Sequence, residues 1–144
     1  AYTHVAHDCR IGNQVILANA ASLGGHVEVQ DWAILGGFAI VHQFCRIGRM
    51  AIIGGCAKVV QDIPPFMMAD GNPAVVRAIN KVGLDRRGVS AEVHETIRKA
   101  FKLLFRSDLT VSNALARIKT ELPRSPELDH LVAFVEKSER GISR

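Results

Sequence analysis

VAHDCRIGNQVILANAASL, residues 5–23, carries a branched aliphatic residue at every sixth position: Val5, Ile11, Leu17 and Leu23. The ladder continues through Val29, Leu35, Val41, Ile47, Ile53 and Val59. The residue after each aliphatic is mostly Ala or Gly, and the fourth residue after it is small or β-branched. A period of six fits neither an amphipathic helix nor an alternating strand. It is typical of hexapeptide repeats, so we predict a parallel β-helix.

Three regions follow from the pattern. Residues 1–63 form the β-helix coils, and Pro64 and Pro65 are expected to stop the ladder because each lacks a backbone donor. Residues 64–89 are expected to be a connecting segment with a turn at residues 71–73. Residues 90–144 read as an α-helical C-terminal domain. The expected helices cover 91–106 after Ser90, Thr110 to about Leu122, and Ser125-Pro126 to near Gly141.

The repeats begin at once, because Ala1 lies four residues before the first ladder aliphatic, Val5. A bare solenoid end exposes strand edges and core aliphatics, which proteins normally cover. We therefore expect earlier coils to precede this stretch, or another chain to cover its end.

Composition narrows the class of protein. The 144 residues carry a formal charge of +4 and are 48% hydrophobic but only 6% aromatic. This mild positive charge suits an acidic partner or a phosphate-bearing ligand, whereas nucleic-acid binding is not indicated. Cys9, Cys45 and Cys56 are too few for a disulfide framework, and Cys9 and Cys45 occupy small interior positions of the hexad, where reduced core thiols are expected. No stretch approaches transmembrane length and no leader pattern is visible, so a soluble cytoplasmic protein is the expectation.

The period also groups polar residues in space. If three hexads complete one triangular coil, residues eighteen apart stack on adjacent coils at roughly the 4.8 Å spacing of strands. Polar and glycine residues then converge on one corner of the solenoid, over three coils. They are His4, His7, Asp8, Gly24, Gly25, His26, His42 and Gln43. Such a cluster on an otherwise aliphatic solenoid is a candidate site.

The residue types at this corner suit acid–base chemistry. A histidine such as His7 can take a proton from a hydroxyl when a carboxylate orients it, although adjacency does not decide whether Asp8 is that group. Gly24-Gly25 offers backbone donors for an oxyanion. The same pair recurs at Gly36-Gly37 and Gly54-Gly55, so a need for positive φ at the corners explains it equally well.

Three further features have more than one interpretation. Several histidines at one corner could hold zinc, but the neighbouring carboxylate, amide and glycine favour acid–base work, so no metal is predicted. Arg86-Arg87 could clamp a phosphate or could be a solvated loop pair. Arg46 and Arg49 could extend a basic face toward an acidic protein.

Several blocks together resemble one family. They are HVAHDC (4–9), LAN (17–19), GGHV (24–27), ILGG (34–37), VHQFC (41–45), GNPA (71–74) and GLDRRG (83–88). The chain is similar to the acyl-[acyl-carrier-protein]–UDP-N-acetylglucosamine O-acyltransferases of lipid A synthesis over all of its residues. It resembles roughly the C-terminal half of the family protein.

The resemblance implies a left-handed parallel β-helix followed by an α-helical domain, in a homotrimer with sites between subunits. The implied reaction transfers an R-3-hydroxyacyl group from acyl carrier protein to the 3-hydroxyl of UDP-N-acetylglucosamine, the first step of lipid A synthesis. It implies no metal and no cofactor beyond the phosphopantetheine that carries the acyl group. His7 matches the general base, Asp8 its supporting acid, and Gly25 the oxyanion donor.

The remaining site residues also come from the resemblance. The substrate contacts it implies are His4, His26 and Gln43, with His42 beside them. Asn80 and Arg86 match positions near the nucleotide and its phosphates, with Arg87 adjacent. Gly55 matches the position that limits acyl-chain length. Val82 stands where the family carries Glu, so that contact is expected to be missing or replaced.

Three alternatives remain open. The sister N-acyltransferase, which acts on the glucosamine amine, shares the fold and a histidine base. A γ-carbonic-anhydrase-like metalloenzyme would use the same solenoid with zinc. A non-catalytic solenoid would keep the polar corner without using it.

Overall fold

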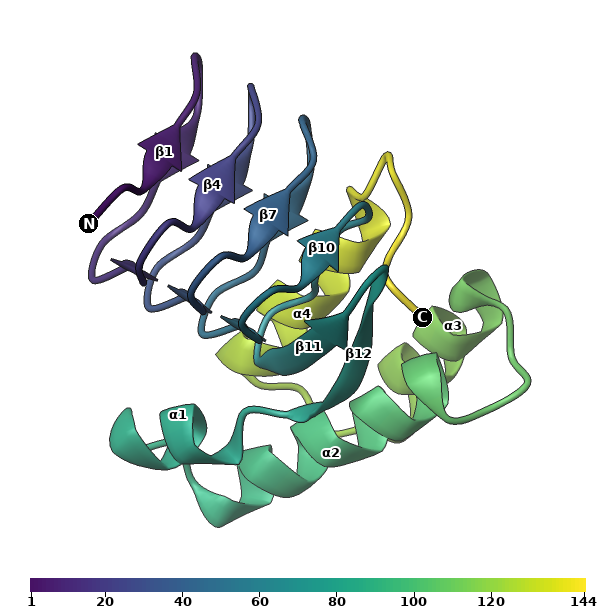
Figure 1. The fold of residues 1–144 in the computed structure, drawn as a ribbon. Helices are drawn as coiled ribbons and strands as arrows, with labels where there is room; N and C mark the ends of the chain where they lie inside the picture. The colour runs from purple at the N-terminus through teal and green to yellow at the C-terminus, as the bar shows by residue number, and fades with distance from the viewer.

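The computed structural model describes all 144 residues and forms a left-handed parallel β-helix with helices at its C-terminal end (Figure 1). Three parallel sheets make the walls. Sheet A contains β1 (His4–Val5), β4 (Ser22–Leu23), β7 (Ile40–Val41) and β10 (Lys58–Val59). Sheet B contains β2 (Arg10–Ile11), β5 (Glu28–Val29) and β8 (Arg46–Ile47). Sheet C begins with β3 (Ile16–Leu17), β6 (Ile34–Leu35) and β9 (Ile52–Ile53). The predicted fold class is confirmed.

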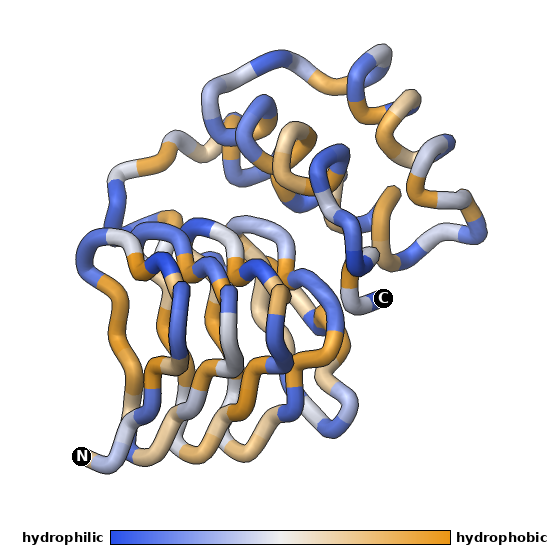
Figure 2. Tube along the Cα trace, turned by 90° about the horizontal axis from the view of Figure 1, so that it is seen from above, coloured by the Kyte–Doolittle hydropathy of each residue, from blue (hydrophilic) through white to orange (hydrophobic).

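The hexad ladder forms the core. Residues eighteen apart pair in register, as in His4 with Ser22 and Val5 with Leu23. The ladder aliphatics from Leu23 to Val59 are buried, and Figure 2 shows hydrophobic residues recurring from coil to coil along the walls. Successive strand residues point to opposite faces, so the residue before each aliphatic faces outward.

Three corners separate the sheets. We call them corner I (residues 7–8, 25–26, 43–44 and 61–62, between sheets A and B), corner II (13–14, 31–32 and 49–50, between B and C) and corner III (19–20, 37–38 and 55–56, between C and A). Every sixth residue from Tyr2 to Cys56 has a φ of 57–65°, which turns the chain at the second position of each corner.

The expectation that the glycine pairs supply this positive φ is wrong. The left-handed residue is the one that follows each pair, such as His26 after Gly25. The glycines are needed for close approach instead, because a Cβ on Gly24 would lie 2.8 Å from Gln43 N and one on Gly36 would lie 2.6 Å from Gly55 N.

The parallel ladder does not stop at Pro64 and Pro65. The chain turns at Phe66, and β11 (Met67–Gly71) pairs in parallel with β9 before β12 (Ala74–Ile79) returns antiparallel. Missing proline donors are tolerated here because Ile63 and Phe66 supply the backbone hydrogen bonds on either side. The segment then forms a short helix, α1 (Lys81–Arg86), which the sequence did not predict.

Three longer helices complete the chain: α2 (Ala91–Phe105), α3 (Val111–Glu121) and α4 (Pro126–Glu136). The predicted caps Ser90, Thr110 and Ser125 each accept a hydrogen bond from the first turn. The last helix ends at Glu136 rather than near Gly141, because the chain leaves to pair at Ile142 with Asp62. No helix combines the length and apolar character that a membrane span requires.

One arginine ties the helices to the solenoid. Arg46 on sheet B donates to Glu28 at 2.8 Å and to the Phe134 carbonyl of α4 at 3.2 Å. Its guanidinium also lies 4.1 Å from the Phe134 ring centroid. The three cysteines are free thiols, with Cys45 buried, Cys9 half-buried and Cys56 exposed.

Candidate active site

Corner I brings His7, Asp8 and His26 into contact. The His7 ring donates from Nδ1 to Asp8 Oδ2 at 2.9 Å, and His26 Nε2 lies 3.6 Å from the same oxygen. The left-handed φ of 60° at Asp8 explains why sequence neighbours meet, since an extended strand would point them apart. The hydrogen bond from His7, followed by the charge of His26, lowers the pKa of Asp8. Asp8 is thus the group that orients His7, a question that adjacency alone left open.

This contact fixes the tautomer of the His7 imidazole, because the carboxylate oxygen of Asp8 can only accept a hydrogen bond. With Nδ1–H donating to an ionised carboxylate, Nε2 of the neutral ring is a free acceptor. The His7 side chain is 73% exposed, so a substrate hydroxyl can reach that nitrogen. The arrangement suits a general base whose conjugate acid the carboxylate stabilises.

Gly25 lies directly under the His7 ring, one coil away. A Cβ at Gly25 would lie 2.7 Å from His7 Cε1 and 2.8 Å from Nε2, so only glycine leaves room for this ring position. The Gly25 carbonyl accepts from Phe44 N, whereas its own N–H has no acceptor in the chain. A buried amide without an acceptor needs an explanation, and a ligand oxygen beside Nε2 would supply one.

The other predicted residues of this corner lie close by. Gln43 occupies the coil beyond Gly25 and is exposed, and His42 beside it contacts the Gln43 carbonyl at 3.2 Å. His4 lies on the outward side of β1, in register with Ser22. Phe44, which the sequence did not single out, stacks on His26 with ring centroids 4.7 Å apart. The eighteen-residue column of Asp8, His26 and Phe44 could have predicted this contact.

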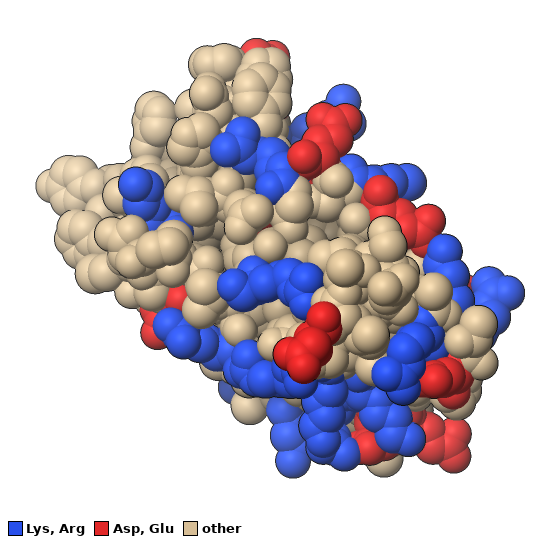
Figure 3. All heavy atoms as spheres, turned by 90° about the vertical axis from the view of Figure 1, so that its right-hand side faces the viewer, with Lys and Arg blue, Asp and Glu red and all other residues tan.

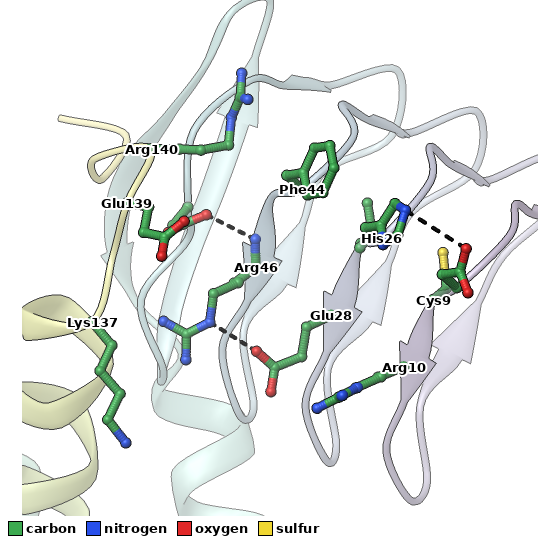
Figure 4. Close-up of a pocket in the computed structure, with 12 residues that line it drawn as sticks. Cys9, Arg10, His26, Glu28, Phe44, Arg46, Lys137, Glu139 and Arg140 are labelled. Atoms are coloured by element: carbon green, nitrogen blue, oxygen red, sulfur yellow. Dashed lines mark hydrogen bonds and ion pairs between the residues drawn. The ribbon is translucent and has the colours of Figure 1, made fainter.

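A groove of about 730 Å³ opens from corner I across sheet B toward the C-terminal segment (Figure 4). Asp8, His26 and Phe44 line one end, and Lys137 and Arg140 line the other. Between them lie Arg10, Glu28 and Arg46, and Figure 4 shows Arg46 turned toward Glu28. The sequence pattern did not predict this groove, because segments 137–140 and 8–46 meet only through the packing of α4.

The predicted nucleotide residues lie at corner II instead. A pocket of about 250 Å³ is lined there by Asn80, Arg86 and Arg87 together with Gln14 and Trp32, among others. Asn80 is buried and its side chain is engaged, since it accepts from Gly83 N at 3.0 Å and donates to Met50 O at 2.8 Å. Val82 is 58% exposed on α1.

Gly55 lies at corner III, where a Cβ would meet the Gly37 carbonyl at 3.2 Å. The predicted site residues therefore occupy three different corners of one chain: His7 at I, Arg86 at II and Gly55 at III. A single chain joins the acid–base residues but does not join them to the arginines or to Gly55.

Corner I also has donor atoms for a cation. One ligand atom from each of His7, Asp8 and His26 lies within 4.8 Å of the other two. Two imidazoles and one carboxylate form a donor set that zinc accepts.

Comparisons with known proteins agree with the family resemblance. A family model described as UDP N-acetylglucosamine O-acyltransferase, domain 2, matches residues 62–143. The acyl-[acyl-carrier-protein]–UDP-N-acetylglucosamine O-acyltransferases of Thermodesulfovibrio yellowstonii and Thiobacillus denitrificans are 54% and 48% identical over 144 residues. Each alignment covers 100% of this chain and 56% of the relative, so the chain spans about half the length of these relatives.

A solved structure gives the same result in three dimensions. The UDP-N-acetylglucosamine acyltransferase from Bacteroides fragilis superposes with a TM-score of 0.97 at 40% identity. The match covers 99% of this chain and 56% of that one.

Proposed function

The chain belongs to the UDP-N-acetylglucosamine O-acyltransferase family, and from this premise we propose that corner I is the acid–base centre of such an enzyme. The reaction is transfer of an R-3-hydroxyacyl group from acyl carrier protein to the 3-hydroxyl of UDP-N-acetylglucosamine, as the first step of lipid A synthesis in the cytoplasm. The observation that carries the proposal is His7, oriented by Asp8, above the unpaired amide of Gly25.

The chemistry follows from these three groups. His7 Nε2 takes the proton of the 3-hydroxyl as its oxygen attacks the thioester carbonyl carbon. Charge develops on the carbonyl oxygen, and the Gly25 N–H donates to it. When the carbon–sulfur bond breaks, the imidazolium returns its proton to the leaving thiolate. Asp8 stabilises the imidazolium between these steps, and no cofactor beyond the carrier's phosphopantetheine is required.

Neighbouring residues have supporting roles in this proposal. His4, His26, His42 and Gln43 contact the substrates around the corner. The groove beside Asp8 and His26 gives the phosphopantetheine arm a path to corner I, and Lys137 and Arg140 at its far end suit a phosphate.

An acidic carrier protein would bind a positively charged surface of the enzyme. Lys and Arg side chains gather along part of the face in Figure 3, and Lys99 and Lys102 on α2 are exposed without ion pairs. Arg46 does not contribute such a free charge, because Glu28 and α4 engage it.

A homotrimer explains why the site residues occupy three corners. Corner I of one subunit would face Asn80, Arg86, Arg87 and Gly55 of its neighbours, completing a site that one chain leaves open. Gly55 then limits the acyl-chain length from the opposite wall. Light scattering that gives three times the chain mass supports this assembly, and a monomer at assay concentration contradicts it.

The decisive experiment measures acyl transfer from R-3-hydroxyacyl carrier protein with UDP-N-acetylglucosamine and, in parallel, with its 3-O-acylated, N-deacetylated derivative. Transfer to the first acceptor that His7→Ala abolishes supports the proposal. Transfer only to the second would make the protein an N-acyltransferase. Activity that His7→Ala leaves unchanged would make corner I a non-catalytic remnant.

A zinc enzyme is the second candidate, favoured by the converging donor atoms of His7, Asp8 and His26. Elemental analysis of purified protein separates it from the first. Stoichiometric zinc that Asp8→Asn and His26→Asn release, together with activity lost on chelation, would overturn the metal-free mechanism.

A further inference from the structure

Helix α1 depends on its neighbours for its position. It has six residues, of which only Leu84 is buried, and so short a helix has little stability of its own. At its start, Asn80 fixes it to corner II through Met50 O and Gly83 N. The far end of α1 carries the two arginines, and other contacts hold it.

The first of these contacts is an aromatic platform. The Arg87 guanidinium carbon lies 3.4 Å from the ring centroid of Trp32, the only tryptophan in the chain. Trp32 is a half-buried corner II residue with a left-handed φ of 65°, and it packs against the hydrophobic core. A stacked guanidinium keeps its N–H donors in the plane parallel to the ring, directed away from it. Neither Arg87 nor Arg86 makes a side-chain hydrogen bond or ion pair within the chain.

The second contact lies on the opposite side of α1. Asp85 Oδ1 is 3.1 Å from His94 Nε2 on α2, and the His94 side chain is only 14% exposed. The contact lacks the alignment of a hydrogen bond, so Nε2 is otherwise without a partner. This pair connects α1 to the helical domain, whereas Trp32 connects it to the solenoid.

Building on the proposed function, we propose that Trp32 and His94 are positioning residues that hold α1 with Arg86 and Arg87 presented to the diphosphate of the nucleotide sugar. Trp32 presets the plane of the Arg87 guanidinium, so its fork is ready for two phosphate oxygens before substrate arrives. The arginines contact the phosphates. Trp32 and His94 act only through them.

A purely structural role for Trp32 would affect stability without affecting phosphate recognition, so the test measures both. The wild-type chain is titrated with UDP by calorimetry, and the emission of Trp32 is followed in the same titration. We expect UDP to change this emission because its phosphates bind the Arg87 guanidinium that stacks on Trp32. Uridine, which has no phosphate, should leave the emission unchanged. Thermal unfolding of each variant monitors stability.

The variants form a double-mutant cycle. Trp32→Leu should weaken UDP binding about threefold to tenfold, whereas Trp32→Phe retains a π-face and should stay within about twofold. Arg87→Met should weaken it at least as much, and the double variant no further, because both changes remove one interaction. Phe38→Leu is the matched control: this exposed aromatic has the same left-handed φ at corner III but no cation on its ring, and UDP binding should not change.

The second contact has its own pair of variants. His94→Leu and Asp85→Asn should each weaken UDP binding by about twofold to fivefold, with no further loss when combined. Neither variant should change the binding of uridine.

The outcomes separate the two ideas. If Arg87→Met weakens UDP binding but Trp32→Leu does not, or if the two losses add, the positioning role of Trp32 is overturned while the proposed function stands. If the wild type binds inorganic pyrophosphate as tightly as UDP, and the variants weaken pyrophosphate binding as expected for UDP, the uridine group adds no affinity. The proposed substrate is then overturned and the positioning role stands. If neither UDP nor pyrophosphate binds, the positioning inference is overturned.

Discussion

The replacement Gly25→Ala tests the geometry of corner I most directly. The new Cβ would lie 2.7 Å from His7 Cε1, whereas non-bonded carbons settle at about 3.5 Å, so the ring must move by about 0.8 Å. A displacement near 1 Å at a catalytic group costs on the order of a hundredfold in rate. We therefore expect kcat for acyl transfer to fall about a hundredfold.

Stability should change far less. The φ of Gly25 lies outside the left-handed region, so alanine fits the backbone, and the exposed His7 ring can move into solvent. We expect a loss below about 1 kcal/mol in the free energy of unfolding, less than the cost of overpacking a closed core. Urea unfolding measures it.

Gly37→Ala supplies the matched control. Gly37 is the equivalent residue of corner III in the same coil, and its Cβ would meet only Asn19 O at 3.4 Å, an ordinary contact. NMR of the His7 imidazole should show a changed Nδ1 proton in Gly25→Ala and not in Gly37→Ala. Near-wild-type transfer by Gly25→Ala, or equal losses in the two variants, would refute the reasoning.

Three other changes give separate expectations. His7→Ala should lower transfer by about 10²–10⁴-fold with an unchanged melting temperature, since the ring is exposed; a rate within threefold of wild type rules out a catalytic base there. Arg46→Met should lower the free energy of unfolding in urea by about 2–3 kcal/mol, the size expected when Glu28 and the Phe134 carbonyl lose a charged hydrogen-bond donor. A loss below about 0.5 kcal/mol argues against this anchoring of α4. Burial raises the pKa of Asp62 above 3.8, so the folded state holds this proton more tightly than the unfolded chain. Stability should then fall as pH rises from about 4 through the raised pKa, and Asp62→Asn should remove that slope; a wild-type stability that rises over this range has the wrong sign.

How far the sequence predicts the site depends on the period. His7, Asp8, Gly25 and His26 were expected at one corner, and the structure brings them into contact because residues eighteen apart stack in parallel register. The eighteen-residue stacking predicts no contact that involves residues outside the repeats. The stack of Arg87 on Trp32 joins a corner to a helix that no sequence pattern predicted, since α1 is stabilised by tertiary contacts rather than by its own residues.

The sequence by itself determined the winding, its core and the composition of corner I. An aliphatic residue at every sixth position predicts a coil of hexapeptide repeats, and this coil fixes which residues share a column. Tertiary structure alone decided what joins the columns to the rest: β11 extends sheet C past two prolines, α4 packs on Arg46, and α1 lies over Trp32. Such contacts link segments with no common period, so their register depends on three-dimensional packing. That packing also brings Asn80, Arg86 and Arg87 to corner II, away from His7 at corner I.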